Sequence, residues 1–432
     1  MRRIVLLSLI VYGLVLAGLA GRDGALLALA LPFAVYLAAE LLNGPEVIEL
    51  QISRTQSTER TGAGLPVDVS VVVTNTGPSL DNVLIEDNVP PGLTVIDGSA
   101  RHLLALPRGK SVTWTYTLHG GRGYYRFTSF TAQARGPLGL ASREQVVPAA
   151  AQLFVLPPLL RLKYVAIRPR RTRVYSGLVP AHMGGPGAEF FGIREYQAGD
   201  PQRWLNWHAT ARHPSTLFSN EFEQERVTDI GIVLDSRERA NARIAGSSIF
   251  EYSALAAAAM ADAFLAQGNR VGLLVYGQFL HWTLPGYGKI QRERILRVLA
   301  QAQPGGSEAF ADLAHIPTRL FPAHSQLVII TPLLPDDLDI LLRLRARGYQ
   351  VLVVSPNPIA FEVALLRRRP DVELAARILR MERTLLLQRA RRAGIQMVDW
   401  DVSMPFEQMM ASRLSRPTTW LRAVSTASRG QP

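Results

Sequence analysis

Cysteine is absent from the 432 residues of the chain. Disulfide scaffolds, thiolate zinc sites and cysteine nucleophiles are therefore excluded, and the composition suits a reducing compartment. Acidic residues are also few, because 35 Asp and Glu stand against 47 Lys and Arg, a formal net charge of +12. Such a chain can bind nucleic acid, an anionic membrane or an acidic protein. Since no basic and aromatic motif of a nucleic-acid reader occurs, we expect no nucleic-acid partner.

The common sequence motifs of enzymes are missing as well. The chain has no phosphate-binding loop of the form GxxxxGK[ST], no GxSxG nucleophile elbow and no HExxH zinc motif. His208 and His213 lack a recognised ligand spacing, and the basic neighbours of Glu189 and Asp200 favour ion pairs over acid–base chemistry. We therefore predict that the chain is not an enzyme, with no catalytic residues, no cofactor and no bound metal.

Two uncharged apolar runs open the sequence, over residues 4–20 and 25–39. Each is close to the lower limit of about 17 residues for a membrane-spanning helix. The glycine-containing turn between them, residues 21–24, is too short to join anything but antiparallel neighbours. The sequence therefore predicts a transmembrane helical hairpin over residues 1–43.

The charges around this hairpin indicate its orientation. Arg2 and Arg3 precede the first run, whereas Arg22 and Asp23 balance each other in the turn. The positive-inside rule then places both ends in the cytoplasm, so we expect two spans in the cell inner (cytoplasmic) membrane with the soluble domains facing the cytoplasm. A signal peptide cleaved after Ala20 is the alternative, and since a second apolar run follows, it also leaves the body cytoplasmic.

The sequence pattern changes over residues 46–158, where apolar and polar residues alternate in short runs. Residues 67–71 and 111–116 are examples, and clusters of Gly, Pro and Asn separate the runs. This spacing predicts a β-sandwich of about a hundred residues. Residues 74–77 and 87–93 resemble the immunoglobulin-like repeats of many prokaryotic surface and envelope proteins, which implies a fold and not an activity.

A linker and an unusual segment follow, over residues 159–226. Arg161–Arg173 holds six Lys or Arg residues and no acid. It is either a contact with anionic lipid headgroups, each basic residue contributing about 1 kcal/mol near the surface, or a solvated linker that pairs with the neighbouring domain.

From Gly187 to Arg212, charged and aromatic residues are interleaved without a helix or strand period. Such a segment is ordered only if its charges pair with one another or with a domain that it wraps. Its arginines have Glu189, Glu195 and Asp200 as available partners, and its tryptophans are expected to be apolar anchors. We call the following positions the signature segment: Gly187, Glu189, Phe190, Arg194, Tyr196, Gly199, Asp200, Arg203, Trp207 and Arg212.

The signature segment closely resembles that of a prokaryotic family called domain of unknown function 58. Every position of the family pattern is present, while Asn206 and Thr210 stand where Asp and Ser are usual. The resemblance implies a membrane hairpin at the N-terminus and a von Willebrand factor A-like domain after the segment. It also implies a MoxR-type AAA+ ATPase as partner, since members are commonly encoded beside such ATPases.

The remaining sequence independently indicates an α/β domain over residues 227–403, followed by a C-terminal tail over residues 404–432. Residues 229–235 form a buried-strand pattern that ends in an acid, and further apolar strands alternate with helical stretches. Such alternation predicts a parallel sheet covered on both faces. The expected fold is thus multi-domain, with the transmembrane hairpin, an immunoglobulin-like β-sandwich and a von Willebrand factor A-like (Rossmann-like) α/β domain.

In the resembled fold, the loop after the first strand often binds a metal through an Asp-x-Ser-x-Ser motif. Here Asp235 is kept, but Arg237 and Arg239 occupy the two Ser positions. A cation beside two guanidiniums is electrostatically unfavourable, so we predict a degenerate metal site in which one arginine pairs with Asp235. We interpret Asp336 and Asp337 as the start of the next helix, whose dipole favours acids.

These observations favour a membrane-anchored, non-enzymatic adaptor or scaffold that acts in complex assembly or envelope maintenance. We expect it to bind other proteins of the same assembly, a MoxR-type ATPase among them, as well as membrane lipid. The expected binding face holds Asp235, with Arg237 and Arg239 as exposed charges, beside the signature segment. The rival hypothesis is a metal-dependent ligand-binding receptor or an envelope enzyme.

Overall fold

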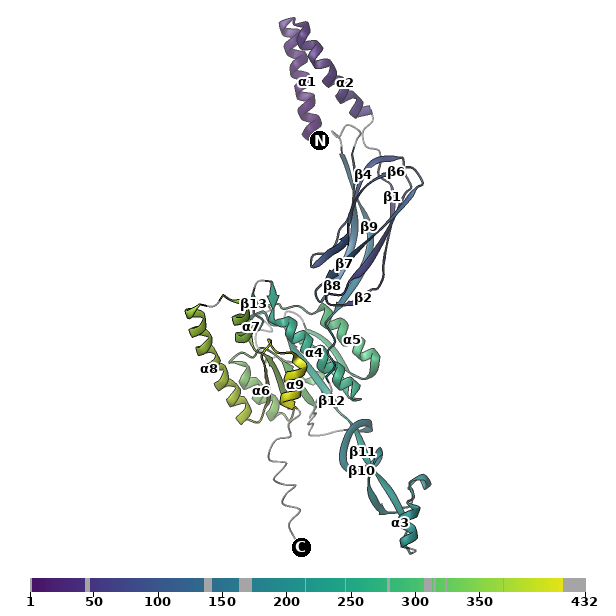
Figure 1. Cartoon of the computed structure of the whole chain (residues 1–432), viewed down its shortest axis with the longest axis vertical. Coiled ribbons are helices and arrows are strands. Elements are labelled where there is room, and N and C mark those ends of the chain that lie inside the picture. Colours follow the sequence, from purple (N-terminus) through teal and green to yellow (C-terminus); the bar gives the residue numbers. More distant parts are fainter. Residues whose placement is uncertain are drawn as a thin grey trace. The chain divides into compact units, whose positions relative to one another are not determined.

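A computed structural model describes the backbone of residues 2–42, 47–135, 142–162, 173–213, 215–244, 246–277, 280–306, 313, 316–322, 325–367 and 369–414. The chain divides into two compact units, Met1–Leu156 and Pro157–Pro432, which Figure 1 draws in purple-to-blue and teal-to-yellow colours.

The first unit begins with the two apolar helices that the sequence predicts, α1 (Arg2–Gly21) and α2 (Gly24–Leu42). Arg22 closes α1 with a positive φ of 48°, and the Asp23 carboxylate accepts a hydrogen bond from the first turn of α2. The helices lie side by side (Figure 1), and a Cβ added at Gly18 would meet Leu27 at 2.9 Å, so a small residue is needed there. Their uncharged runs, Val5–Gly21 and Gly24–Ala39, are shorter than a full span but apolar along their length.

Two sheets form the rest of the first unit and face each other across one apolar core. Strand β3 illustrates the origin of this core, because its even-spaced valines from Val67 to Val73 are buried while the residues between them are not. One sheet has the order β1 (Leu50–Gln56), β3 (Val67–Asn75), β7 (Ser111–Gly120), β5 (Leu93–Gly98). The other has the order β2 (Arg60–Gly62), β9 (Ser142–Leu156), β8 (Gly123–Arg135), β4 (Leu80–Asp87), β6 (Arg101–Leu106).

A charged pair lies in this core. The Arg54 guanidinium donates from Nε to Asp87 at 3.0 Å, and it lies over the rings of Phe127 and Phe130. Tyr116 donates its hydroxyl to the same carboxylate at 2.6 Å. Burial, reinforced by the Asp87 charge, raises the pKa of Tyr116, so the phenol remains a donor. Arg54, Asp87 and Tyr116 therefore join β1, β4 and β7 at one point of the core.

The second unit contains a six-stranded sheet, in which every neighbour is parallel except for the edge strand β16. The parallel strands are almost fully buried, which explains their continuous apolar sequences. The order of the sheet is β16 (Leu280–Gly286), β15 (Arg270–Tyr276), β12 (Asp229–Asp235), β17 (Gln326–Ile330), β18 (Gln350–Pro356), β19 (Gln396–Trp400). This arrangement confirms the C-terminal α/β region.

Six helices accompany the sheet in the described part of the second unit: α4 (Ile249–Ala266), α5 (Gly288–Gln301), α6 (Asp337–Ala346), α7 (Pro358–Leu365), α8 (Pro370–Arg392) and α9 (Phe406–Leu414). Helix α4 is the one helix of the described residues whose length and hydropathy suffice for a membrane span. It is 67% buried, however, and its alanines pack in the core, so it is a core helix of this unit. Helix α9 lies inside the predicted tail, where Phe406 packs on Trp400 of β19.

Candidate functional site

The carboxyl ends of the parallel strands carry a buried polar cluster around Arg237. Asp235 ends β12, and Arg237 follows it in the loop. Arg237 donates from Nε to Asp235 Oδ1 at 2.9 Å and from Nη2 to Oδ2 at 2.7 Å. Its Nη2 also donates to Asp337 Oδ2 at 2.9 Å, at the start of α6. The prediction that an arginine pairs with Asp235 is therefore confirmed, with a second carboxylate added.

Further hydrogen bonds hold this cluster in place. Thr331, just after β17, donates its hydroxyl to Asp235 Oδ2 at 2.7 Å. The Asn241 side chain donates to the backbone carbonyls of Asp235 and Arg237 and so closes the loop. Because β12 and β17 are parallel neighbours, their carboxyl ends bring Asp235 and Thr331 to the same edge. The arginine is thus bound at a fixed position.

The expectation that Arg237 is an exposed charge is wrong, since its side chain is only 2% exposed. Burial alone would lower the pKa of Arg237, but hydrogen bonds and charge attraction from Asp235 and Asp337 outweigh it and raise that pKa. Burial raises the pKa of Asp337, although Arg237 acts in the opposite direction. The guanidinium fills the space between the two carboxylates, so the residues present do not fit a divalent cation there.

Arg239 differs from Arg237, although both follow Asp235 in the same loop. It lies in the short helix η2 (Glu238–Ala240), and its side chain is 42% exposed. Its Nη1 is 3.9 Å from Asp336 Oδ2, a carboxyl group that is itself 78% exposed. Of the two arginines, only Arg239 therefore presents its charge to solvent.

A second buried arginine lies at the same edge of the sheet, and sequence reasoning missed it. Arg383 of α8 donates to Asp399 Oδ1 from Nε at 3.0 Å and from Nη2 at 2.6 Å. It also donates to the Ser355 hydroxyl and to the carbonyl of Pro332, next to Thr331. An arginine inside an amphipathic helix pattern resembles an ordinary surface residue, so only the distant acid at Asp399 would have identified it.

The signature segment forms a two-stranded ribbon with a short helix. Strand β10 (Arg173–Glu195) pairs with β11 (Phe218–Val227), and α3 (Trp207–Arg212) lies between them in the chain, after the 3-10 turn η1 (Gln202–Trp204). The register of the ribbon shifts four times. Such bulges explain why the sequence shows no strand period although the residues form a strand.

The polar groups of the ribbon are paired locally. Arg194 donates to Asp200 at 2.7 Å, and its Nε lies 3.7 Å from Glu221, so one of the predicted ion pairs is confirmed. The hydrogen bonds from Arg194 and from the backbone N–H of Gln197 lower the pKa of Asp200. Gly199, which lies between Gln197 and Asp200 in the chain, has a φ of +110°, a conformation that disfavours any side chain.

The two departures from the family pattern have structural roles here. Asn206 caps α3 by accepting from the backbone N–H of Ala209, and its amide donates to Asn220 at 2.7 Å. An aspartate could cap the helix but could not donate. Thr210 accepts a hydrogen bond from the backbone N–H of Phe218. Both residues therefore tie α3 to β11.

Several signature side chains are exposed, which contradicts the expectation that Trp207 is a buried anchor. Trp207 is 69% exposed and Phe190 60%, and Ile193 and Leu217 are each about half exposed, at 48% and 47%. Trp204 is half-buried, and Tyr196 donates its hydroxyl to the Asp200 carbonyl at 3.4 Å. Arg203 and Arg212 are exposed, while Gly187 and Glu189 belong to β10, with side chains outside the described residues.

Within the described ranges, no group of three or more His, Cys, Asp or Glu side chains is placed to hold a metal ion. The second unit instead has two arginine-centred clusters at the carboxyl edge of its sheet, around Arg237 and Arg383. Neither contains a free nucleophile or a general base next to a pocket, among the residues described.

Comparisons with known proteins place part of the chain in a family. Residues 192–360 match the family model described as "Protein of unknown function DUF58". No curated protein matches the chain. Among solved structures, the chain is similar to the CARDB domain of a Pyrococcus furiosus protein (14% identity, 26% of this chain and 90% of that one, TM-score 0.18). It is also similar to a FixG-related protein from Vibrio parahaemolyticus (6% identity, 25% and 98%, TM-score 0.18).

TM-scores this low carry no argument about fold or function. The family match is different in kind, because it spans most of the signature segment from Gly192 onward and continues through β12, the Asp235 loop and β18 as far as α7. Residues 192–360 of the chain therefore carry the domain of the DUF58 family of proteins of unknown function.

Proposed function

We propose that the chain is a membrane-tethered, non-enzymatic adaptor that binds other proteins through two surfaces, the ribbon of β10 and β11 that carries the signature segment and the carboxyl edge of a von Willebrand factor A-like domain. The observation that carries this proposal is the exposure of Trp207 and Phe190, at 69% and 60%. Within the ribbon Arg194 pairs with Asp200 and Glu221, and neither aromatic takes part in these contacts. Exposed aromatics on an ordered segment are typical anchors for a protein partner.

The arginine cluster supports an A-type domain that works without metal. In a domain of this type, the cation would lie between Asp235 and the acids of neighbouring loops. Arg237 places a positive charge beside Asp235 and Asp337 at that edge. The side chains of all three residues are at most 2% exposed. The carboxyl edge of a parallel sheet is the usual ligand face of open α/β folds. A guanidinium fixed there would keep the ligand face ordered at any cation concentration.

The partner that we propose is a MoxR-type AAA+ ATPase, acting with this chain in complex assembly or envelope maintenance. Arg203 and Arg212 on the ribbon and Arg239 at the carboxyl edge are exposed, so each of the two surfaces carries positive charge that suits an acidic partner. Arg237 contributes to the carboxyl edge only indirectly, by holding the loop that carries Arg239.

Binding of a purified MoxR-type ATPase to the full chain in detergent micelles tests the partner proposal. Trp207→Ala should weaken capture, whereas Trp282→Ala should not, because Trp282 is also exposed, at 53%, but lies on the edge strand β16. Arg239→Glu should slow association, and Arg297→Glu is its control, since Arg297 is similarly exposed and paired on α5. Full capture by both Trp207→Ala and Arg239→Glu would refute the proposed surfaces.

The membrane part of the proposal has its own test. We propose two spans, α1 and α2, in the inner membrane with the soluble units in the cytoplasm, supported by Arg2 and Arg3 ahead of an apolar pair of helices. A reporter fused to the C-terminus should then behave as cytoplasmic. Cleavage of the β-sandwich by protease added outside intact cells would overturn this orientation.

A further inference from the structure

The buried face of helix α8 determines which side of the helix faces the core. Ala376, Arg383, Leu387 and Ala390 are the buried residues of this 23-residue helix, and they recur at intervals of seven, four and three. Arg383 at the centre is held by Asp399, Ser355 and the Pro332 carbonyl. Since breaking these bonds would leave a buried charge unpaired, α8 cannot turn its other side toward the core.

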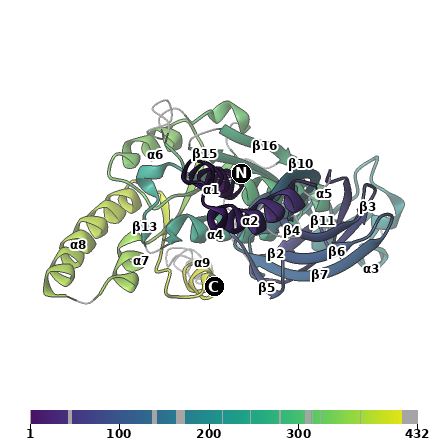
Figure 2. The same cartoon turned by 90° about the horizontal axis from the view of Figure 1, so that it is seen from above.

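The opposite side of α8 carries an exposed apolar stripe. Leu374, Ile378, Met381 and Leu385 are exposed by 61%, 51%, 63% and 56%. Their spacing of four, three and four places them along one face, turned away from Arg383. Figures 1 and 2 both show α8 at one margin of the α/β region, opposite α5. We call these four residues the α8 stripe, and a contiguous exposed stripe of this kind marks a binding surface.

Basic residues surround the α8 stripe. Between Leu365 and Arg392, the described residues include seven exposed arginines and three exposed acids, an excess of four positive charges. The arginines are Arg367, Arg369, Arg377, Arg380, Arg389, Arg391 and Arg392, and the acids are Asp371, Glu373 and Glu382. Leucines at the end of α7, Leu365 and Leu366, extend the apolar surface and are each 42% exposed.

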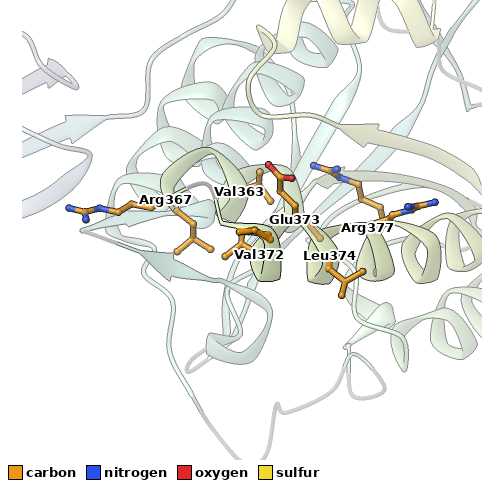
Figure 3. A pocket seen from close by; sticks show the side chains of 10 residues that line it. Val363, Arg367, Val372, Glu373, Leu374 and Arg377 are labelled. Atoms are coloured by element: carbon orange, nitrogen blue, oxygen red, sulfur yellow. The ribbon is translucent and has the colours of Figure 1, made fainter.

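A groove of about 580 Å³ lies where α7 meets α8. Its lining combines apolar residues such as Val372 and Leu374 with three arginines, Arg367, Arg377 and Arg380, and one acid, Glu373, a net excess of two positive charges. Figure 3 shows Arg367 and Arg377 at opposite ends of the groove, with Val363, Val372 and the Glu373 carboxylate between them. Apolar side chains in a groove with an excess of positive charge suit an amphiphile that has a negatively charged head.

We propose that the α8 stripe and this groove bind the surface of an anionic lipid bilayer, with the apolar side chains at the level of the headgroups and the arginines on the phosphates. A basic helix with one apolar face is the usual form of an interfacial membrane helix. A second copy of the chain fits less well, because seven arginines would face seven others. The stripe also spans less than two heptads, whereas a stable interface buries about 800 Å² on each partner.

This inference rests on the proposed membrane tether, which would hold α8 near a bilayer at high effective concentration. A weak interfacial contact is then sufficient to position the α/β unit against the lipid. Each arginine close to an anionic surface contributes about 1 kcal/mol. The α8 stripe would thereby orient the ligand face of the unit relative to the membrane plane.

The absence of cysteine makes a direct experiment possible, since a single introduced cysteine is the only site of labelling. The full chain carrying Met381→Cys, labelled with an environment-sensitive fluorophore, is reconstituted into vesicles of phosphatidylcholine alone or of equal parts phosphatidylcholine and phosphatidylglycerol. Gln301→Cys is the control position, because Gln301 is exposed and ends α5, a different helix from α8. Flotation of the vesicles measures the tether separately from the probe.

We expect a blue shift of the Met381→Cys probe with phosphatidylglycerol, little shift with phosphatidylcholine, and none at Gln301→Cys in either. Arg377→Glu with Arg380→Glu should abolish the shift while leaving flotation unchanged. A chain that floats without a shift overturns this inference and leaves the tether intact, whereas a chain that does not float overturns the tether. A shift that depends on protein density and not on lipid charge would assign the stripe to a second copy and overturn the lipid proposal.

Discussion

Arg237 donates to both carboxylate oxygens of Asp235, from Nε at 2.9 Å and from Nη2 at 2.7 Å, two residues further along the chain. This fork-to-fork geometry is the strongest form of an arginine–carboxylate contact. Because Nη2 also reaches Asp337, one guanidinium joins the ends of β12 and α6 across a hundred residues of sequence. A fixed positive charge thus lies between carboxylates that could otherwise coordinate a cation.

Replacing Arg237 by Ser should convert this cluster into a cation site. Without metal, the variant should lose about 3–5 kcal/mol of unfolding free energy, because Asp235 and Asp337 are left buried and unpaired. Magnesium or manganese should restore part of that loss, seen as a rise in melting temperature relative to chelator. Arg239→Ser is the control and should change neither quantity, since its side chain is 42% exposed. An Arg237→Ser variant indifferent to metal would show that the carboxylates do not form a cation site.

Arg383 should be as important to stability as Arg237. Arg383→Met keeps much of the side-chain volume but leaves Asp399 without its partner, at a cost of about 3–5 kcal/mol. Arg380→Met, three residues earlier and exposed, should stay within about 0.5 kcal/mol. Urea unfolding of the two variants, followed by far-UV circular dichroism, measures the difference. Equal stabilities would mean that Arg383 contributes no more than a surface residue.

Trp207→Ala should leave the fold intact, because the indole is 69% exposed. We expect a change within about 0.5 kcal/mol, as for other surface positions. Trp400 is the contrast, since it is 2% exposed and packs on Phe406, so Trp400→Ala should cost about 3–5 kcal/mol. Thermal melting distinguishes the two outcomes. A Trp207→Ala variant as unstable as Trp400→Ala would show that the signature braces a domain junction instead of binding a partner.

Asp200 should make the stability of the chain depend on acid pH. The hydrogen bond from Arg194 is the largest cause of its lowered pKa, which lies below the unfolded value of about 3.9. The ionised carboxylate therefore contributes stability above about pH 4, and the contribution is lost as pH falls through the lowered folded-state pKa. Asp200→Asn removes this contribution. The melting-temperature difference between wild type and Asp200→Asn should hold at neutral pH and shrink in acid, and a pH-independent difference would contradict the assignment.

Periodicity alone was enough to predict the sheets and the apolar helices. The alternation in β3 and the continuous apolar run of β12 each correspond to a distinct burial pattern, on one face or on both. The pairing of Arg237 with Asp235 could also be predicted, because the two residues are neighbours in sequence. The predicted binding face, by contrast, treated Arg237 as a surface charge.

What could not be predicted depends on residues that are distant in the chain. Arg237 is buried because Asp337, a hundred positions later, and Thr331 complete its surroundings. Arg383 is buried for the same reason, through Asp399 and Ser355. The four register shifts of β10 against β11 remove the alternation by which a strand is recognised. Trp207 was expected to be buried because of its residue type, whereas its position at the first turn of α3 exposes it.

The central claim is that Arg237 makes the Asp235 edge independent of divalent cations. The most direct measurement is the melting temperature of the wild-type chain in chelator and in excess magnesium. We predict the same value in both, because the guanidinium already bridges Asp235 and Asp337. A clear rise with magnesium that Asp235→Ala removes would show that the loop coordinates a cation and would contradict the account.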